Sequence, residues 1–202
     1  MYSLKEAQTD VDILDLVKKR WSPRAFSDKE IKPATLLKIL EAARWSASSR
    51  NEQPWRFILG RKGKGESYDK ILSSLDEGNR IWCRNAPLLI LLIAKKTFTS
   101  RDIPNIYAVY DCGQAAAYLS IQAIKEKVYV HQMAGFNPEK ARQLFLIPED
   151  FVPQTAIAAG YLGDPSILPE DLRQSETKAR TRRDLNTLVY DEEWGQPADI
   201  FE

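Results

Sequence analysis

Hydrophobic residues along the chain follow two patterns, one helical and one strand-like. Apolar positions three or four residues apart predict amphipathic helices, in the segments 10–20, 33–47, 67–75, 104–126 and 138–145. Short apolar runs predict strands, at 55–59, 88–94, 128–131 and 155–161. Because the run 88–94 is apolar at every position, we expect a strand that is buried on both faces.

Signals at the ends of these segments refine the prediction. Asp10 is suited to cap the first helix, and Pro33 is favoured at the first position of the second. The helix 104–126 is apolar around much of its circumference, which is typical of a core or a subunit interface. From Gln174 onward the chain is polar and highly charged until residues 185–190, so this tail cannot pack by hydrophobic burial alone.

Composition narrows the class of protein. A length of 202 residues suits a single domain, 1–202, with 174–202 as a C-terminal tail. A net charge of +1 argues against nucleic-acid or membrane partners. Cys83 and Cys112 lack metal-ligand spacing, so no metal is expected and both are predicted to be reduced thiols. The apolar run 86–94 is too short for a bilayer, and the start lacks an apolar leader, which predicts a soluble, cytoplasmic protein.

Two polar motifs follow the first two predicted helices. Arg20, Ser22 and Arg24 occupy alternate positions, which places them on one side of an extended backbone. The second motif, Ser-Ser-Arg-Asn-Glu-Gln-Pro-Trp at 48–55, lies between a helix and a strand. Arginine forks suit a phosphate, whereas short hydroxyl and amide side chains can bind a polyol chain or an amide-like ring edge. The sequence lacks a nucleotide-binding loop of the usual kinds, because Gly60–Gly65 is followed by Glu66 where a P-loop needs lysine, and no G-x-G-x-x-G motif occurs.

These segments resemble the nitroreductase family, whose chains carry an Arg-x-Ser-x-Arg-x-Phe motif followed by Ser-Ser-x-Asn-x-Gln-Pro-Trp. Both motifs occur here in the same order and spacing. Further similarity lies at 78–87, at 133–137 and at 180–183, so that the resemblance spans about 12–189. Position 47 departs from the pattern, because it is alanine where proline is common.

The resemblance implies a fold, a cofactor and an activity. The fold is α+β, a mixed central sheet flanked by helices, in an intertwined homodimer with two FMN sites and with the tail reaching across to the partner. The activity is hydride transfer from NADH or NADPH to flavin N5, then to a nitroaromatic, quinone or similar acceptor, in a ping-pong cycle. FMN is the bound cofactor and NAD(P)H a transient donor. A dehalogenase or flavin-fragmenting enzyme of the same fold, or a non-catalytic flavin-binding protein, are the alternatives.

The resemblance also implies cofactor contacts from both motifs. Arg20 and Ser22 are implied to bind the phosphate and ribityl chain, and Arg24 to place a cation near the ring, where it would stabilise the reduced flavin. The second motif, contributed by the other subunit, is implied to supply Ser48, Ser49, Asn51 and Gln53.

Three later segments complete the implied set. Asn79 is expected to contact the pyrimidine edge, and the backbone of Ala134 and Gly135 to lie near N5. Arg180 and Arg182 are implied to bind the phosphate, with Arg183 as a substitute if the register slips by one. The acceptor pocket is expected to involve residues 98–110 or Trp21.

Each of these residues also has a structural interpretation. The arginines at 20, 24 and 180–183 could be solvated, and Ser48 and Ser49 could simply end a helix. Asn79 could cap a turn, Gly135 could supply a positive φ, and Trp55 is expected in the core. His131, the single histidine, is expected to be packed or on the surface rather than catalytic.

Overall fold

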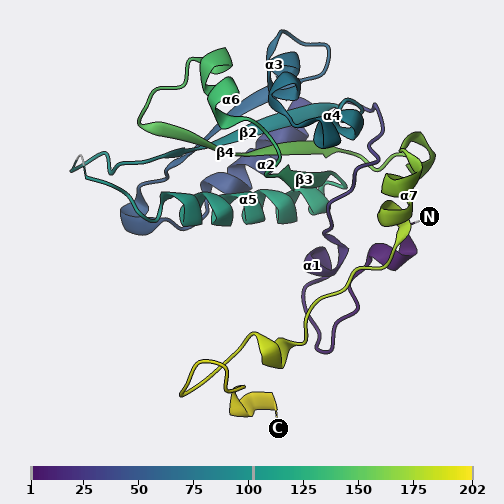
Figure 1. Ribbon diagram of the computed structural model, residues 1–202, viewed down its shortest axis with the longest axis vertical. Coiled ribbons are helices and arrows are strands. Elements are labelled where there is room, and N and C mark those ends of the chain that lie inside the picture. The colour runs from purple at the N-terminus through teal and green to yellow at the C-terminus, as the bar shows by residue number, and fades with distance from the viewer. Residues whose placement is uncertain (1, 102, 202) are drawn as a thin grey trace.

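The computed structural model describes residues 2–101 and 103–201, which form an α+β fold (Figure 1). Within these residues the sheet has four strands in the order β1-β2-β4-β3. Their bounds are β1 Trp55–Arg61, β2 Leu88–Lys95, β3 Tyr129–Met133 and β4 Phe151–Gly160. Every pair of neighbouring strands is antiparallel, so the prediction of a mixed sheet was wrong in that respect.

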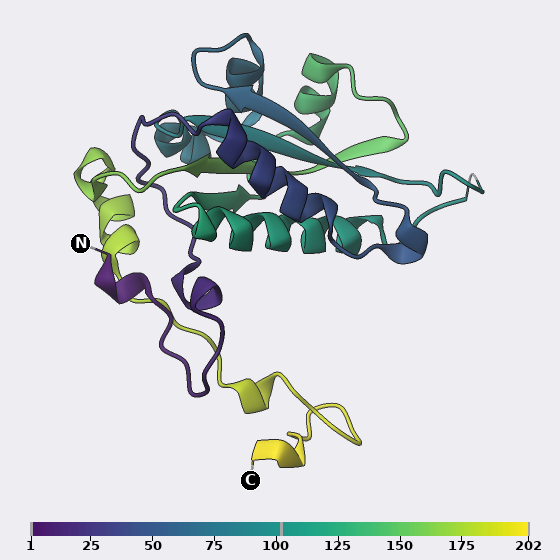
Figure 2. The ribbon, with the colours of Figure 1, turned by 180° about the vertical axis from the view of Figure 1, so that it is seen from behind.

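The continuous burial of β2 has a different origin from the one that a parallel sheet would give. One face of the sheet is covered by α2 (Pro33–Arg44) and α5 (Ala108–Lys125), and the other by α3 (Ser67–Ser74), α4 (Glu77–Cys83) and α6 (Pro138–Phe145) (Figures 1 and 2). Alternate residues of β2 therefore enter two separate cores, with Ile90 and Leu92 on one face and Leu89 and Leu91 on the other. An antiparallel strand covered by helices on both faces carries the same apolar run as a parallel one.

The predicted helices and strands match the structure best where they contribute to the two cores. The segments of α3 and α6 and the strands β1, β2 and β3 end within two residues of the predicted bounds, whereas β4 begins at Phe151 instead of 155 and α2 ends three residues early. The helix α5 begins at Ala108 rather than 104, because Asn105 first turns back to donate its backbone N–H to the Lys96 carbonyl oxygen at 2.7 Å. Two helices were not predicted, α4 and α7 (Glu170–Thr177).

The first helix is much shorter than predicted. It spans α1 Asp15–Lys19, and the residue before it is Leu14, so Asp10 is not its cap. Val11, Leu14 and Val17 are 64%, 73% and 40% exposed. An amphipathic helix is stabilised mainly by packing of its apolar face, and these side chains enter neither of the two cores that the described residues form.

The C-terminal tail leaves the body of the molecule beside the N-terminal segment (Figures 1 and 2). Its apolar side chains remain largely exposed, with Leu185, Leu188, Trp194 and Ile200 between 51% and 93% accessible. The structure also contains short 3-10 helices, which are η1 Ser3–Lys5, η2 Ser49–Asn51, η3 Pro165–Ile167, η4 Leu185–Thr187 and η5 Asp199–Phe201. Among the described residues, none of the helices has the length and apolar character needed to cross a bilayer.

Candidate functional site

The first polar motif forms a loop that is tied to the end of the sheet. The backbone N–H of Ser27 donates to the Tyr161 carbonyl oxygen and that of Gly163 to the Ala25 carbonyl oxygen, both at 2.9 Å. A Cβ atom at Gly163 would lie 2.6 Å from the carbonyl carbon of Phe26. Only glycine allows the chain after β4 to approach so closely, and this contact places residues 25–27 beside the end of β4.

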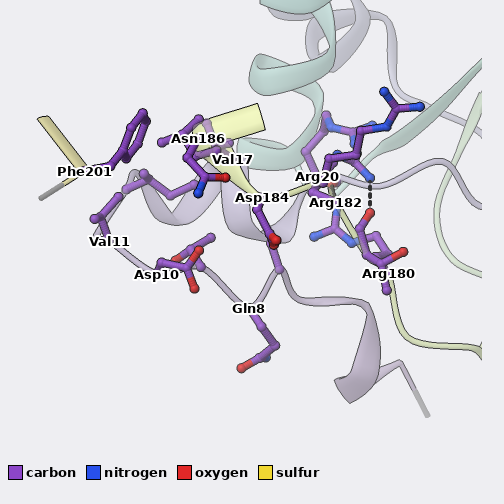
Figure 3. Close-up of a pocket in the computed structure, with 16 residues that line it drawn as sticks. Gln8, Asp10, Val11, Val17, Arg20, Arg180, Arg182, Asp184, Asn186 and Phe201 are labelled. Atoms are coloured by element: carbon purple, nitrogen blue, oxygen red, sulfur yellow. Dashed lines mark hydrogen bonds between the residues drawn. The ribbon is translucent and has the colours of Figure 1, made fainter. Parts of the chain in front are cut away.

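Arg20, Arg180 and Arg182 gather at one end of a cavity between the N-terminal segment and the tail (Figure 3). The cavity measures about 720 Å³, and Asp10, Val11, Asp184 and Phe201 are among its other lining residues. Arg20 Nη1 donates to Ser22 Oγ at 3.4 Å. The structure therefore brings together arginines that are 160 residues apart in the sequence.

Arg180 combines a structural contact with an unused donor. Its two Nη atoms donate to the carbonyl oxygens of Arg20 and Lys18, both at 2.6 Å. Its Nε atom is buried and has no partner among the described residues. Burial, followed by the charges of Arg20 and Arg182, lowers the pKa of Arg180.

The cluster lacks a compensating carboxylate contact. Within residues 2–101 and 103–201, none of Arg20, Arg180 and Arg182 forms a salt bridge. Burial and the charge of Arg182 lower the pKa of Arg20. Guanidinium groups that lie close together in a partly buried place are suited to hold an anion, and their fork geometry matches phosphates and carboxylates.

The second motif forms a turn with an unusual backbone. Arg50, Asn51 and Gln53 have φ angles of 54°, 55° and 50°, a region that non-glycine residues rarely adopt. The turn is held by hydrogen bonds from Gln53 N–H to Ser48 Oγ and from Ser49 N–H to Asp111 Oδ2, both at 3.0 Å. Since α2 already ends at Arg44, this turn is more than the end of a helix.

Two carboxylates that the sequence analysis missed support this turn. Asp111 is buried on α5 and accepts the Ser49 N–H. Glu52 accepts hydrogen bonds from the backbone N–H of Thr99 at 3.0 Å and from its Oγ1 at 2.5 Å, and pairs with Lys95 at 3.5 Å. Strained backbone of this kind is maintained by its surroundings and occurs preferentially at functional sites.

The second motif lines a different cavity, of about 250 Å³, with Ser48, Ser49, Tyr107, Tyr110 and Asp111 among its lining residues. This cavity and the arginine cavity share no lining residue. In both ribbon views the turn, drawn in blue, lies at the opposite end of the sheet from α1 (Figures 1 and 2). One chain therefore does not bring the two motifs together.

The residues that were expected to line the acceptor pocket differ in where the structure places them. Tyr107 and Tyr110, from the predicted segment 98–110, line the second cavity. Trp21 is 4% exposed and packs against Tyr2 and Tyr129, with ring centroids 5.2 and 6.2 Å away, so it lines neither of the two cavities.

Asn79 and Gly135 meet at the end of β3. Asn79 Nδ2 donates to the Gly135 carbonyl oxygen at 2.9 Å, and Ala134 beside them is exposed. Gly135 does not have a positive φ, so that interpretation was wrong. A Cβ atom at this position would lie 2.6 Å from Asn79 Nδ2, so a larger residue would displace the Asn79 amide from its present place.

His131 is packed, as predicted. Its Nδ1 atom lies 2.9 Å from the Pro23 carbonyl oxygen, which can only accept, so Nδ1 carries the proton. Its ring centroid lies 4.7 Å from that of Trp82. Burial lowers the pKa of His131 to about 4.

Comparisons with known proteins identify the family of this chain. The nitroreductase family model matches residues 17–80. A Methanothermobacter thermautotrophicus protein named "Putative NADH dehydrogenase/NAD(P)H nitroreductase" is 31% identical over 158 residues, covering 75% of this chain and 78% of that protein. The chain belongs to the nitroreductase family.

Solved structures extend the similarity across the nitroreductase fold. A crystal structure described as an oxidoreductase containing FMN is 31% identical, with a TM-score of 0.89 over 95% of this chain and 98% of that one. An FMN-dependent nitroreductase from Clostridium difficile R20291 is 25% identical, with a TM-score of 0.67 over 89% of this chain and 98% of that one. The residues that match the nitroreductase family model include both polar motifs.

The low pKa of His131 predicts a pH dependence of stability. Between pH 6.5 and about 4 the unfolded chain binds a proton that the folded chain does not, so the free energy of unfolding falls as the pH is lowered through this window. Relative to His131→Gln, the wild type should lose up to about 3 kcal/mol more between pH 7 and pH 4. Chemical denaturation of both proteins at each pH measures this difference, and parallel pH profiles would contradict it.

Proposed function

We propose that this protein is an FMN-dependent oxidoreductase that passes hydride from NADH or NADPH to a nitroaromatic, quinone or similar electrophilic acceptor in a ping-pong cycle. The observation that carries the proposal is the cluster of Arg20, Arg180 and Arg182, which lines a cavity without a salt bridge to any described carboxylate. Similarity to solved FMN-containing oxidoreductases supports it.

The residues present fit the phosphate end of FMN. The buried Arg180 Nε has no partner among the described residues, and a phosphate oxygen is an acceptor that would satisfy it. Arg20 and Arg182 supply further donors, and the Ser22 hydroxyl suits the ribityl chain. A volume of about 720 Å³ lies within the range of small-molecule and cofactor sites.

When bound, FMN supplies the hydride chemistry at its N5 atom. The protein's own residues would position it. Arg24 holds a positive charge on the same loop as Arg20, where it would stabilise negative charge on the reduced ring. Asn79 and the backbone of Ala134 and Gly135 remain our candidates for contacts to the ring, with Asn79 Nδ2 already bound to the Gly135 carbonyl oxygen.

We further propose that each site is completed by a second copy of the chain. The arginine cavity and the Ser48 turn lie at opposite ends of one chain (Figures 1 and 2), so one FMN cannot contact both in the same copy. In a homodimer the turn of one chain, with Ser48, Ser49, Asn51 and Gln53, would face the arginines of the other. The chain would then be one domain, with 174–202 as an arm that is covered by the partner.

Exposed apolar side chains support this assembly. Tyr110 and Tyr118 on α5 are 69% and 50% exposed, and Leu14 and Trp194 in the two terminal segments are 73% and 93% exposed. Apolar side chains gathered on a helix face and on a projecting arm are typical of surfaces that a partner covers. Dimer formation would bury them and close the FMN site in the same step.

Anaerobic reduction tests the activity. FMN-loaded protein mixed with NADH or NADPH without oxygen should lose the yellow absorbance of its flavin with at least one donor, far faster than free FMN does. Adding a nitroaromatic or a quinone should then restore the colour. Flavin that stays oxidised with both donors would favour a non-catalytic flavin-binding protein, and reoxidation by halogenated phenols alone would favour a dehalogenase.

Removal of a guanidinium tests the phosphate assignment. Arg20→Ala and Arg182→Ala should each weaken FMN binding by about 1.5–3 kcal/mol, the contribution of a charge-assisted hydrogen bond. Lys38→Ala, which removes an exposed cation on α2, is the control and should leave affinity unchanged. Titration of apoprotein with FMN measures the effect, and unchanged affinity in both arginine variants would refute the assignment.

Complementation between two defective variants tests the shared site. Arg20→Ala/Arg182→Ala chains and Ser48→Ala/Asn51→Ala chains should each bind FMN weakly alone. If each site combines two chains, a heterodimer has one site with both defects and one intact site. Mixing and subunit exchange should therefore restore tight FMN binding in about half of the heterodimer's sites. No recovery in isolated heterodimers would show that one chain supplies both motifs.

A further inference from the structure

Glu176 is a buried carboxylate near the end of α7, far in sequence from the loop that it contacts. It is 1% exposed. Its Oε1 atom accepts the backbone N–H of Arg24 at 2.8 Å and that of Ala25 at 2.9 Å, while Oε2 has no partner among the described residues. One oxygen therefore fixes two consecutive peptide groups of the Arg20–Phe26 loop.

The same end of α7 holds the other end of this loop. The helix ends at Thr177, and Arg180 follows in the tail, where its guanidinium donates to the carbonyl oxygens of Lys18 and Arg20 at 2.6 Å. Residues 20–25 are thus held at one end by a cation that binds carbonyl oxygens and at the other by a carboxylate that binds N–H groups. The two residues that hold them lie four positions apart.

Lys5 lies behind this carboxylate. Its Nζ atom donates to the Ser175 carbonyl oxygen at 3.0 Å and lies 5.0 Å from the centroid of the Trp21 ring. It is 7% exposed, and burial lowers its pKa, an effect that the charge of Glu176 opposes. Lys5 therefore binds the helix end that carries Glu176 and places a positive charge near its carboxylate.

A carboxylate is a costly side chain to bury, and its contacts show what it does there. Burial of an ionised group is unfavourable unless hydrogen bonds and opposite charges compensate it. The hydrogen bonds of Glu176 go to the backbone of the loop that carries Arg20, Ser22 and Arg24. Two N–H groups that converge on one oxygen restrict the φ and ψ angles of Arg24 and Ala25, which sets the direction in which the neighbouring side chains leave the loop.

We propose that Glu176 is a positioning residue that orients the Arg20–Phe26 loop so that Arg20 binds the phosphate of FMN. This inference rests on the proposed function. It assigns Glu176 no contact with the cofactor, because the carboxylate acts through the backbone of Arg24 and Ala25.

A comparison of FMN with riboflavin, which lacks the phosphate, tests the inference. Glu176→Ala should weaken FMN binding about tenfold or more while riboflavin affinity changes little, so that the preference for FMN falls. Glu176→Gln keeps an oxygen acceptor in place and should retain the wild-type preference. Glu170→Ala, on the exposed face of the same helix, is the matched control and should behave as the wild type.

A second variant keeps the test decisive if Glu176→Ala does not fold. Glu176→Asp retains the charge but is one methylene shorter, so its oxygen cannot reach both N–H groups, and the preference for FMN should fall here also. An unchanged ratio of FMN to riboflavin affinity in Glu176→Ala, or in Glu176→Asp if the alanine variant is unfolded, overturns the inference and leaves the proposed function intact. A wild type that binds neither flavin overturns the proposed function and this inference with it.

Discussion

Repulsion among guanidinium groups is the constraint on which the proposed site depends. Burial and then the charge of Arg182 lower the pKa of Arg20, and burial followed by the charges of Arg20 and Arg182 lowers the pKa of Arg180. Such an arrangement is unfavourable in the free protein and becomes favourable when an anion enters. The Arg180 hydrogen bonds to two carbonyl oxygens hold the cluster together in the meantime.

The Ser48 turn, the second half of the proposed site, carries strain in its backbone rather than repulsion between charges. Arg50, Asn51 and Gln53 adopt left-handed conformations, and the hydrogen bonds of Ser48, Glu52 and Asp111 hold them there. A turn that is fixed before binding loses little conformational entropy when it contacts a ligand. Both halves are therefore arranged in advance, one by electrostatics and one by hydrogen bonds, and each is anchored to a different end of the sheet.

In the proposed homodimer, the separation of the two motifs would link FMN binding to assembly. The sheet is covered by packed helices on both faces, and this rigid body keeps the two motifs apart within one chain. In the proposed homodimer, a second copy would offer the missing half and would also cover the exposed apolar residues of α5 and the tail. In this arrangement the free energy of FMN binding and that of dimer formation reinforce each other.

The sequence by itself was sufficient for features that depend on neighbours within one element. The apolar run of β2, the periodicity of α3 and the proline at the start of α6 place those elements correctly, and the spacing of Arg20, Ser22 and Arg24 identified the loop at the arginine cavity. Only the tertiary structure decided the antiparallel pairing of the strands, the short α1, and the contacts of Arg180 and Glu176 with residues about 150–160 positions away. Local periodicity reports which side of an element is apolar, but it carries no information about which distant backbone groups a charged side chain will meet. That depends on how the sheet and helices bring the two ends of the chain together.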